Sequence, residues 1–414
     1  MNASWQEELK SNALNYFLKY VKINSKSDPA SETLPSTKEQ LQLGKIVVAD
    51  LLELGITDAE QDEHGYVYAT LPASNGVTKP PISFIAHLDT SPSESGENVK
   101  PVIHPNYQGE VITFADDPNL ILSPQNSPEL TKFVGEDIIT ASGLTLLGAD
   151  DKAGVAEIMA ACSWLISHPE KRHPELKIVF TPDEETGRGV EAINRAKVAP
   201  VAYTIDGGEI GELEAECFDA WSVKITFTGR NVHPGSAKNI MLNAGAIAAH
   251  FFAALPEWET PEHTEKREGF YHLGNIAGDE NNSALDFILR DFAPERNRQR
   301  LNYLEQLKNL FLIRYPGLDI NIKAANSYQN MYFILKDHPE ILQKAEQAYR
   351  EAGIDIIHNA IRGGTDGARL CYMGIPTPNI FAGGLMYHSK LEWIPVIALQ
   401  KGAEVIVNLA QLYA

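Results

Sequence analysis

The chain has 414 residues, of which 43% are hydrophobic and 22% charged, an ordinary composition for a globular protein long enough to form two domains. Lys and Arg total 35 against 55 Asp and Glu, so the formal net charge is −20. An acidic surface repels phosphate backbones, which excludes nucleic acid as the expected partner. The N-terminal residues are acidic and lack the apolar core of a secretory signal, and no apolar run is long enough to cross a bilayer.

Cysteine usage agrees with this picture of a protein without a membrane partner. Cys162, Cys217 and Cys371 lie far apart and form no Cys-x-x-Cys pair. A disulfide framework and a cysteine-based zinc site are therefore not expected. The pattern is typical of buried, reduced thiols, and we expect a cytoplasmic protein.

Two amphipathic helices are predicted at the start of the chain. Apolar residues recur at helical spacing over residues 5–21 and 38–54. Ser4 is the expected N-cap of the first helix, and Ser36 or Thr37 of the second.

An alternation of strands and helices follows. Short apolar runs at residues 82–86, 177–181 and 201–205 each end in polar residues, and residues 152–166 have a helical pattern between them. This order predicts an α/β fold with a largely parallel sheet, in which functional sites lie beyond the carboxyl ends of the strands. The long loop at residues 91–137 is predicted to be a β-hairpin excursion or an irregular flap.

The pattern changes near residue 218. Residues 221–228 alternate like a half-exposed strand, residues 242–255 form an Ala-rich helix, and strand patterns at 286–292 and 319–323 flank an amphipathic segment at 294–312. We interpret this part as an α+β insertion, after which the α/β pattern resumes.

The first candidate metal ligands follow the predicted strands and the helix start. His87 and Asp89 share one face of a strand end, where Asp89 is placed to accept the second ring N–H of His87. A structural His–Asp pair explains this motif equally well on its own. Asp150 and Asp151 precede a helix, so either is expected as its N-cap, and one carboxylate there is an alternative bridge between two metal ions.

Two neighbouring glutamates give the stronger signal. Glu184 and Glu185 follow an apolar strand, and on extended backbone their side chains would point to opposite sides. One would then bind metal while the other stays available as a general base. Asp206 ends another strand, and His388 is an isolated histidine near the C-terminus. Imidazoles and carboxylates without cysteine favour two zinc ions, with Mn²⁺ or Co²⁺ as alternatives.

These motifs together resemble the M20 metallopeptidases over the length of the chain. The matching segments are 84–90 (FIAHLDT), 148–154 (GADDKAG), 181–187 (TPDEETG), 203–208 (YTIDGG), 229–238 (GRNVHPGSAK) and 362–367 (RGGTDG). The segment around His388, LMYHSKLEW, departs from the glycine-bearing aromatic sequence expected there.

The resemblance implies a discontinuous α/β zinc-peptidase domain, residues 1–217 and 331–414, with residues 218–330 as an α+β lid that also forms a homodimer. It implies that one zinc takes His87 and Asp206, the other takes Glu185 and His388, and Asp150 bridges them. It further implies a cis peptide bond between Asp150 and Asp151.

The resemblance also implies functional roles outside the ligand set. Glu184 would be the general base and Asp89 the catalytic partner of His87. His233, Arg290 and Arg362 would bind the substrate, with His233 and Arg290 reaching it from the lid. The implied activity is removal of the N-terminal residue from short peptides, in the first place tripeptides.

Three other functions stay open. The first is another M20 hydrolase, such as a dipeptidase, carboxypeptidase or deacylase. The second is a nucleotide-binding α/β protein, although the sequence contains neither a P-loop motif nor a Gly-x-Gly-x-x-Gly after a strand. The third is an inactive scaffold, which the complete set of expected ligands disfavours.

Overall fold

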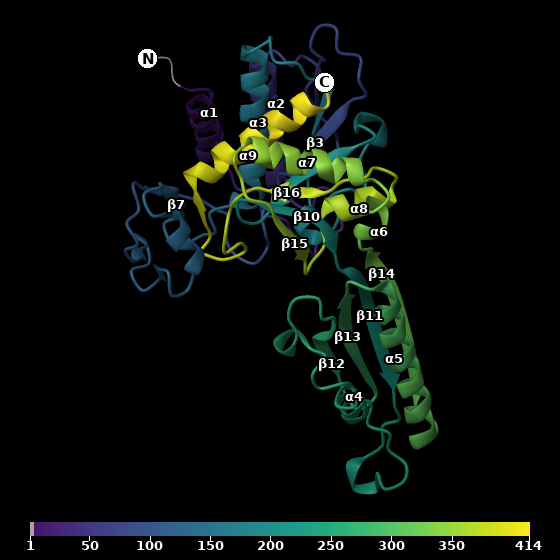
Figure 1. Ribbon diagram of the computed structural model, residues 1–414. Coiled ribbons are helices and arrows are strands. Elements are labelled where there is room, and N and C mark those ends of the chain that lie inside the picture. Colours follow the sequence, from purple (N-terminus) through teal and green to yellow (C-terminus); the bar gives the residue numbers. More distant parts are fainter. Residues whose placement is uncertain (1–3) are drawn as a thin grey trace. The chain divides into compact units, whose positions relative to one another are not determined.

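The computed structural model describes residues 4–414, which divide into two compact units. The first unit runs to Ala215 and resumes over Phe333–Asn359 and Thr365–Ala414. The second consists of Glu216–Tyr332 and the short segment Ala360–Gly364. Figure 1 shows both, coloured along the chain.

An eight-stranded sheet organises the first unit, in the order β1-β2-β8-β3-β9-β16-β10-β15. The four central strands, β8, β3, β9 and β16, are parallel, as predicted. The sheet is mixed, because β2 pairs antiparallel with β8, and β10 pairs antiparallel with β16. The strands are β1 (Glu60–Gln61), β2 (Val67–Leu71), β3 (Ile82–His87), β8 (Leu176–Thr181), β9 (Ala202–Gly207), β10 (Glu212–Cys217), β15 (Ile357–Ile361) and β16 (Asn379–Phe381).

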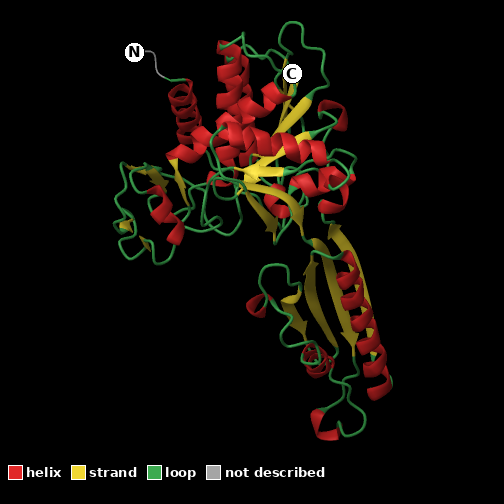
Figure 2. Ribbon diagram, in the orientation of Figure 1, coloured by secondary structure: helices red, strands yellow, loops and turns green. Residues whose placement is uncertain are grey.

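Helices cover this sheet, as the red ribbons of Figure 2 show. Helices α1, α3 and α9 pack against one another, and α7 packs against α9. Within residues 4–414, none of the helices combines the length and apolarity that crossing a membrane requires. The helices are α1 (Trp5–Tyr20), α2 (Glu39–Glu53), α3 (Ala149–Ser167), α6 (Tyr332–Leu335), α7 (Pro339–Glu351), α8 (Asp366–Tyr372) and α9 (Val396–Leu412).

The two predicted N-caps have different outcomes. Ser4 caps α1, since its hydroxyl accepts the backbone N–H of Glu7. The prediction for α2 is wrong, because its N-cap is Lys38, without a side-chain hydrogen bond. Ser36 instead directs its backbone N–H and its hydroxyl to the buried carboxylate of Asp183, so a tertiary contact replaces the local cap.

The long loop between β3 and α3 forms a small layer of its own. It contains β4 (Val102–His104), β5 (Ile112–Thr113), β6 (Ile121–Leu122), a 3₁₀ turn at Pro128–Phe133 and β7 (Ile138–Thr140). β7 pairs with β4 and with β17 (Trp393–Pro395) from near the C-terminus. Tyr107, Phe133 and Trp393 lie in its separate apolar core.

The second unit is an antiparallel sheet in the order β12-β13-β11-β14, covered by α4 and α5. Its core gathers the alternate apolar residues of the strands, such as Ile225 and Phe287, with Phe251 and Phe311 from the two helices. The elements are β11 (Asp219–Thr228), α4 (Ala244–Phe252), β12 (Phe270–Gly278), β13 (Asn282–Asp291), α5 (Pro294–Arg314) and β14 (Asp319–Tyr328).

One glycine lets α3 lie close to β9. A methyl group at Gly154 would overlap the backbone carbonyl oxygen of Ile205 and also approach the carboxylate of Asp151. The absence of a side chain therefore sets the distance between the start of α3 and the end of β9.

We predict that Gly154→Ala destabilises the protein, because neither the strand backbone nor the helix can shift freely. Overpacking of this kind typically costs about 1–3 kcal/mol. Gly274→Ala, in β12, is the matched control, since a methyl group there meets its nearest atom, the backbone oxygen of Asp286, at an ordinary 3.7 Å. Thermal unfolding should show a lower midpoint for Gly154→Ala only, and equal midpoints would contradict the packing argument.

Candidate metal centre

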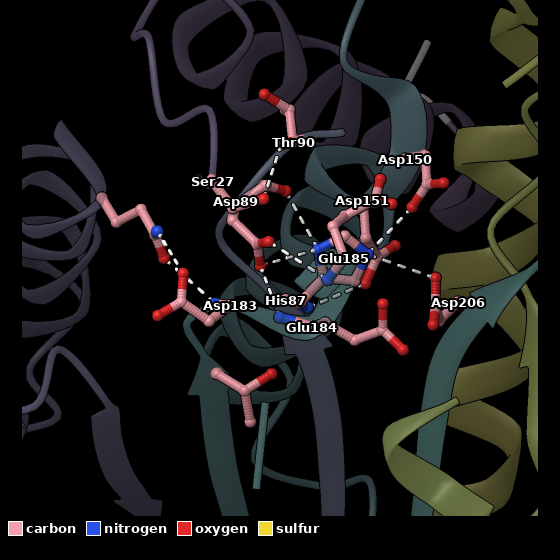
Figure 3. Close-up of polar contacts among 12 residues, drawn as sticks. Ser27, His87, Asp89, Thr90, Asp150, Asp151, Asp183, Glu184, Glu185 and Asp206 are labelled. Atoms are coloured by element: carbon pink, nitrogen blue, oxygen red, sulfur yellow. Dashed lines mark hydrogen bonds and ion pairs between the residues drawn. The ribbon is translucent and has the colours of Figure 1, made fainter. Parts of the chain in front are cut away.

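Polar side chains from three neighbouring parallel strands meet at one edge of the sheet, as the sequence predicts. His87 is the last residue of β3 and lies opposite Thr181, the last residue of β8. The loop after β8 carries Glu184 and Glu185, while Asp206 lies near the end of β9. Asp150 reaches the same place from the start of α3 (Figure 3).

Asp150 lies between two imidazoles. One of its carboxylate oxygens is 2.9 Å from Nε2 of His87, and the other is 3.1 Å from Nε2 of His388. The His87 nitrogen is also 3.4 Å from Asp206, and the His388 nitrogen is 3.0 Å from Glu185. Two donor sets therefore share one carboxylate, which is the arrangement expected for a bridging ligand.

The donor atoms suit divalent ions. Two ligand atoms bound tetrahedrally at about 2.0–2.1 Å from zinc lie about 3.3 Å apart, close to the separations observed here. Oε1 of Glu185 is buried and makes no hydrogen bond within the described residues, despite its proximity to His388. A buried carboxylate oxygen normally has a partner, and a cation would provide one.

His87 belongs to two groups of possible ligands, one with Asp150 and Glu185, the other with Asp151 and Asp206. The oxygens of Asp151 accept the backbone N–H groups of His87 and Gly154, at 3.0 and 3.2 Å. Asp151 thus ties the backbone of β3 to that of the first regular turn of α3, while Asp150 turns to the imidazoles. The peptide bond between the two aspartates is cis, as the family resemblance implies.

Asp89 holds the glutamate loop more directly than it holds His87. Its carboxylate accepts the backbone N–H groups of Glu184 and Glu185, at 3.0 and 3.2 Å. Nδ1 of His87 lies 2.9 Å from the backbone oxygen of Asp89 and 3.4 Å from its carboxylate. The His87 ring is therefore oriented mainly by a backbone carbonyl, which spacing along a strand cannot reveal.

The two glutamates point in different directions, although not for the predicted reason. Residues 184–186 form a 3₁₀ turn rather than extended backbone, after Asp183 in a left-handed conformation. Glu185 turns toward His388, whose Nε2 lies 3.0 Å from its carboxylate. The carboxylate of Glu184 makes no hydrogen bond or ion pair with any described residue, and in Figure 3 no dashed line reaches it. Glu184 is consequently available to a ligand.

Carboxylates outnumber imidazoles in this cluster, and pKa values are raised on side chains of both kinds. Although burial opposes the charged form, Asp206 and Asp150 raise the pKa of His87 well above its usual value. The nearby carboxylates of Asp150 and Glu185 raise the pKa of His388 to about 10. Burial, reinforced by Asp150, raises the pKa of Glu185 to about 7. Such shifts mark a surplus of negative charge that divalent cations would balance.

Three predicted substrate-binding residues belong to the second unit. His233 is exposed, and its Nδ1 accepts the N–H of Gly235. Arg290 stacks over Tyr328, 5.2 Å from the ring centre.

The guanidinium of Arg362 is already hydrogen-bonded within the second unit. It donates to the backbone oxygens of Lys266 and Glu268, at 2.6 and 3.0 Å, and to Thr264. It also lies over the rings of Phe218 and Phe270. In this structure the side chain therefore holds the loop at residues 264–268.

Sequence reasoning missed several acids near the cluster. Asp183 is buried against Ser36 and Gln40, and Asp366 accepts the hydroxyl of Thr181 at 2.8 Å. Glu392 is 1% exposed in an apolar stretch beside Trp393. The available signal was an acidic residue between two large apolar ones, Leu391 and Trp393. A glutamate that is buried there needs hydrogen-bond partners, because glutamate is rarely buried without them.

Comparison with known proteins assigns the chain to a family. The model of peptidase family M20/M25/M40 matches residues 147–412. Peptidase T of Halothermothrix orenii is 47% identical over 96% of this chain and 98% of its own. The crystal structure of aminopeptidase PepT from Bacillus cereus superposes with a TM-score of 0.77 at 23% identity, covering 98% of both chains. YXEP of Bacillus subtilis, described as a dinuclear metal-binding peptidase of family M20, follows with a TM-score of 0.67 at 13% identity, covering 98% of both. The chain belongs to peptidase family M20/M25/M40.

Proposed function

We propose that this protein is a two-metal aminopeptidase that removes the N-terminal residue from short peptides, in the first place tripeptides. The observation that carries the proposal is Asp150 between His87 and His388, with Asp206 and Glu185 completing the two donor sets. Near-full-length relatives named peptidase T support the peptide substrate.

The proposed ions are zinc, with Mn²⁺ or Co²⁺ as alternatives. His87 and Asp206 would hold one ion, Glu185 and His388 the other, and Asp150 both. Two divalent ions in such a site lower the pKa of a shared water and polarise the peptide carbonyl. Mixed imidazole and carboxylate donors without cysteine favour these metals over softer ones.

Glu184 is the proposed general base. Its carboxylate has no hydrogen-bond or ion-pair partner within residues 4–414, while Asp89 fixes the backbone of the loop that carries it. Burial, reinforced by Asp206, raises the pKa of Glu184 well above its usual value, and the cations of the proposed site would favour its charged, proton-accepting form. In the proposed reaction Glu184 takes a proton from the attacking water and passes it to the leaving amine.

We place this activity in the cytoplasm. Cys162, Cys217 and Cys371 are all buried, and none of them forms a disulfide. Such thiols are typical of a reducing compartment.

Two neighbouring glutamates provide a matched pair of variants. We predict that Glu184→Gln keeps both ions but lowers kcat by about 10²–10⁴-fold, the usual contribution of general acid–base catalysis. Glu185→Gln should lose bound metal, because it removes a charged ligand. Elemental analysis and initial rates on a tripeptide measure both effects. Normal turnover of Glu184→Gln would assign the base to another residue.

The substrate class is tested with a tripeptide, its dipeptide and tetrapeptide analogues, and the N-acetylated tripeptide. We expect the free tripeptide to be hydrolysed fastest, with release of its first residue, and the acetylated form to resist. A chelator should abolish the activity and added Zn²⁺ should restore it. Preferential cleavage of the acetylated substrate would indicate a deacylase, and activity insensitive to the chelator would exclude the metal mechanism.

We also propose that residues 1–217 and 331–414 form the catalytic domain and residues 218–330 a lid that forms the homodimer. Apolar side chains support a partner surface on the second unit, since Ile313 is 78% exposed and Leu310 is 58% exposed on α5. Exposed apolar groups gathered on one element usually mark an interface.

For the lid we predict that His233→Ala lowers kcat on a tripeptide while bound metal stays unchanged, because the imidazole would stabilise charge that develops in the transition state. His263→Ala, an exposed histidine of the same unit, is the control. Sedimentation at micromolar concentration should show a dimer. Full activity of His233→Ala would remove this residue from the mechanism, and a monomer would exclude the homodimer.

A further inference from the structure

Glu392 is a buried carboxylate that the reaction proposed above does not use. It is 1% exposed and accepts three backbone N–H groups of residues 147–150, the segment that leads into α3. One of its oxygens accepts from Leu147 at 2.8 Å and from Gly148 at 2.7 Å, and the other accepts from Asp150 at 3.1 Å. The two ends of this contact are more than 240 residues apart in the sequence.

The loop is shaped to receive an anion. Gly148 has left-handed backbone angles, φ 82° and ψ 31°, and successive N–H groups in such a turn converge on one point. Gly148 has no side chain that could accept these N–H groups, so Glu392 provides the acceptor from a distant part of the chain.

Glu392 also belongs to the segment that carries His388. Leu385 and Trp393 pair through two backbone hydrogen bonds, of 2.9 and 3.1 Å, which close the segment between them into a loop. Within it, the hydroxyl of Tyr387 donates to the backbone oxygen of Gly207, next to Asp206. One closed loop thus contacts the Asp206 strand end, contributes His388 and holds the backbone of Asp150.

We propose that Glu392 is a positioning residue that fixes the bridging carboxylate of Asp150 relative to His388, and so sets the affinity of the site for its ions. This inference rests on the two-metal assignment above. Asp150 can serve both donor sets only if its backbone is held where each oxygen faces one imidazole. Because His388 and Glu392 share one closed loop, the distance between the two ligands is set by that loop.

Glu392→Gln is the sharpest probe, because it keeps the size of the side chain. In the wild type, each of the two carboxylate oxygens accepts at least one backbone N–H. Glutamine has only one side-chain oxygen, so its NH₂ group would face an N–H group and leave that N–H without an acceptor. Outer-layer partners of metal ligands typically change metal affinity by about 10–100-fold when they are replaced. We expect a loss of that size.

The experiment titrates the metal-free protein with Zn²⁺ in competition with a chromophoric chelator, and records the visible spectrum with Co²⁺. We expect the wild type to bind two ions and Glu392→Gln to bind at least one of them about 10–100-fold more weakly, with an altered Co²⁺ spectrum. Glu404→Gln is the matched control, since Glu404 is equally buried, and among the described residues its carboxylate accepts hydrogen bonds from Gln400 and Lys401 on α9. It should change neither readout.

The outcomes separate this inference from the proposed function. If the wild type binds no metal, the two-metal assignment itself fails. If the wild type binds two ions and Glu392→Gln matches it in affinity and spectrum, only the role of Glu392 is overturned. Should Glu392→Gln not fold, Glu392→Asp keeps the charge and shortens the side chain by one methylene. Weakened binding of an ion by that variant supports the proposal, and unchanged affinity for both ions contradicts it.

Discussion

Mutual repulsion among buried carboxylates is the constraint on which the rest of the first unit depends. Asp150, Glu184, Glu185 and Asp206 share one small volume with two imidazoles. Away from bulk water, like charges at these separations repel strongly and favour either protonation or separation. A fold that keeps them together must therefore hold their backbones firmly, and it must present the cluster to cations that relieve the repulsion.

A second group of acids meets the first of these requirements. Each of three expected ligands has its own backbone N–H bound by a carboxylate outside the expected ligand set. Asp151 accepts from His87, Asp89 from Glu185, and Glu392 from Asp150. One group of acids faces the proposed ions, and the other faces the backbone. The second group gains hydrogen bonds from N–H groups, which stabilise a buried carboxylate without adding a cation.

The sequence predicts the parts of this design that follow from periodicity. The apolar runs before His87, Glu184 and Asp206 become neighbouring parallel strands, which is why these three side chains meet. The antiparallel edge strands escaped prediction, because strands such as β1 and β10 are short or half-polar and take their direction from tertiary pairing. The roles of Ser36, Asp89 and Glu392 also escaped, since each depends on a partner that only the fold brings close: the Asp183 carboxylate for Ser36, and backbone N–H groups for the two acids. Arg362 is an instructive case: the glycine loop beside it suggests an anion site, whereas its donors contact the chain's own carbonyl oxygens.

The second unit is built from two separate segments of the chain, because the five residues Ala360–Gly364 belong to it. Although most of the unit is the continuous segment Glu216–Tyr332, the backbone oxygen of Ile361 accepts the N–H of Phe218, and Arg362 holds the 264–268 loop. A gene fragment for the continuous segment alone would leave the Phe218 and Phe270 rings without the guanidinium that covers them. Exchanging this unit between relatives by recombination thus takes two grafts rather than one, and the small graft must evolve in step with the large one.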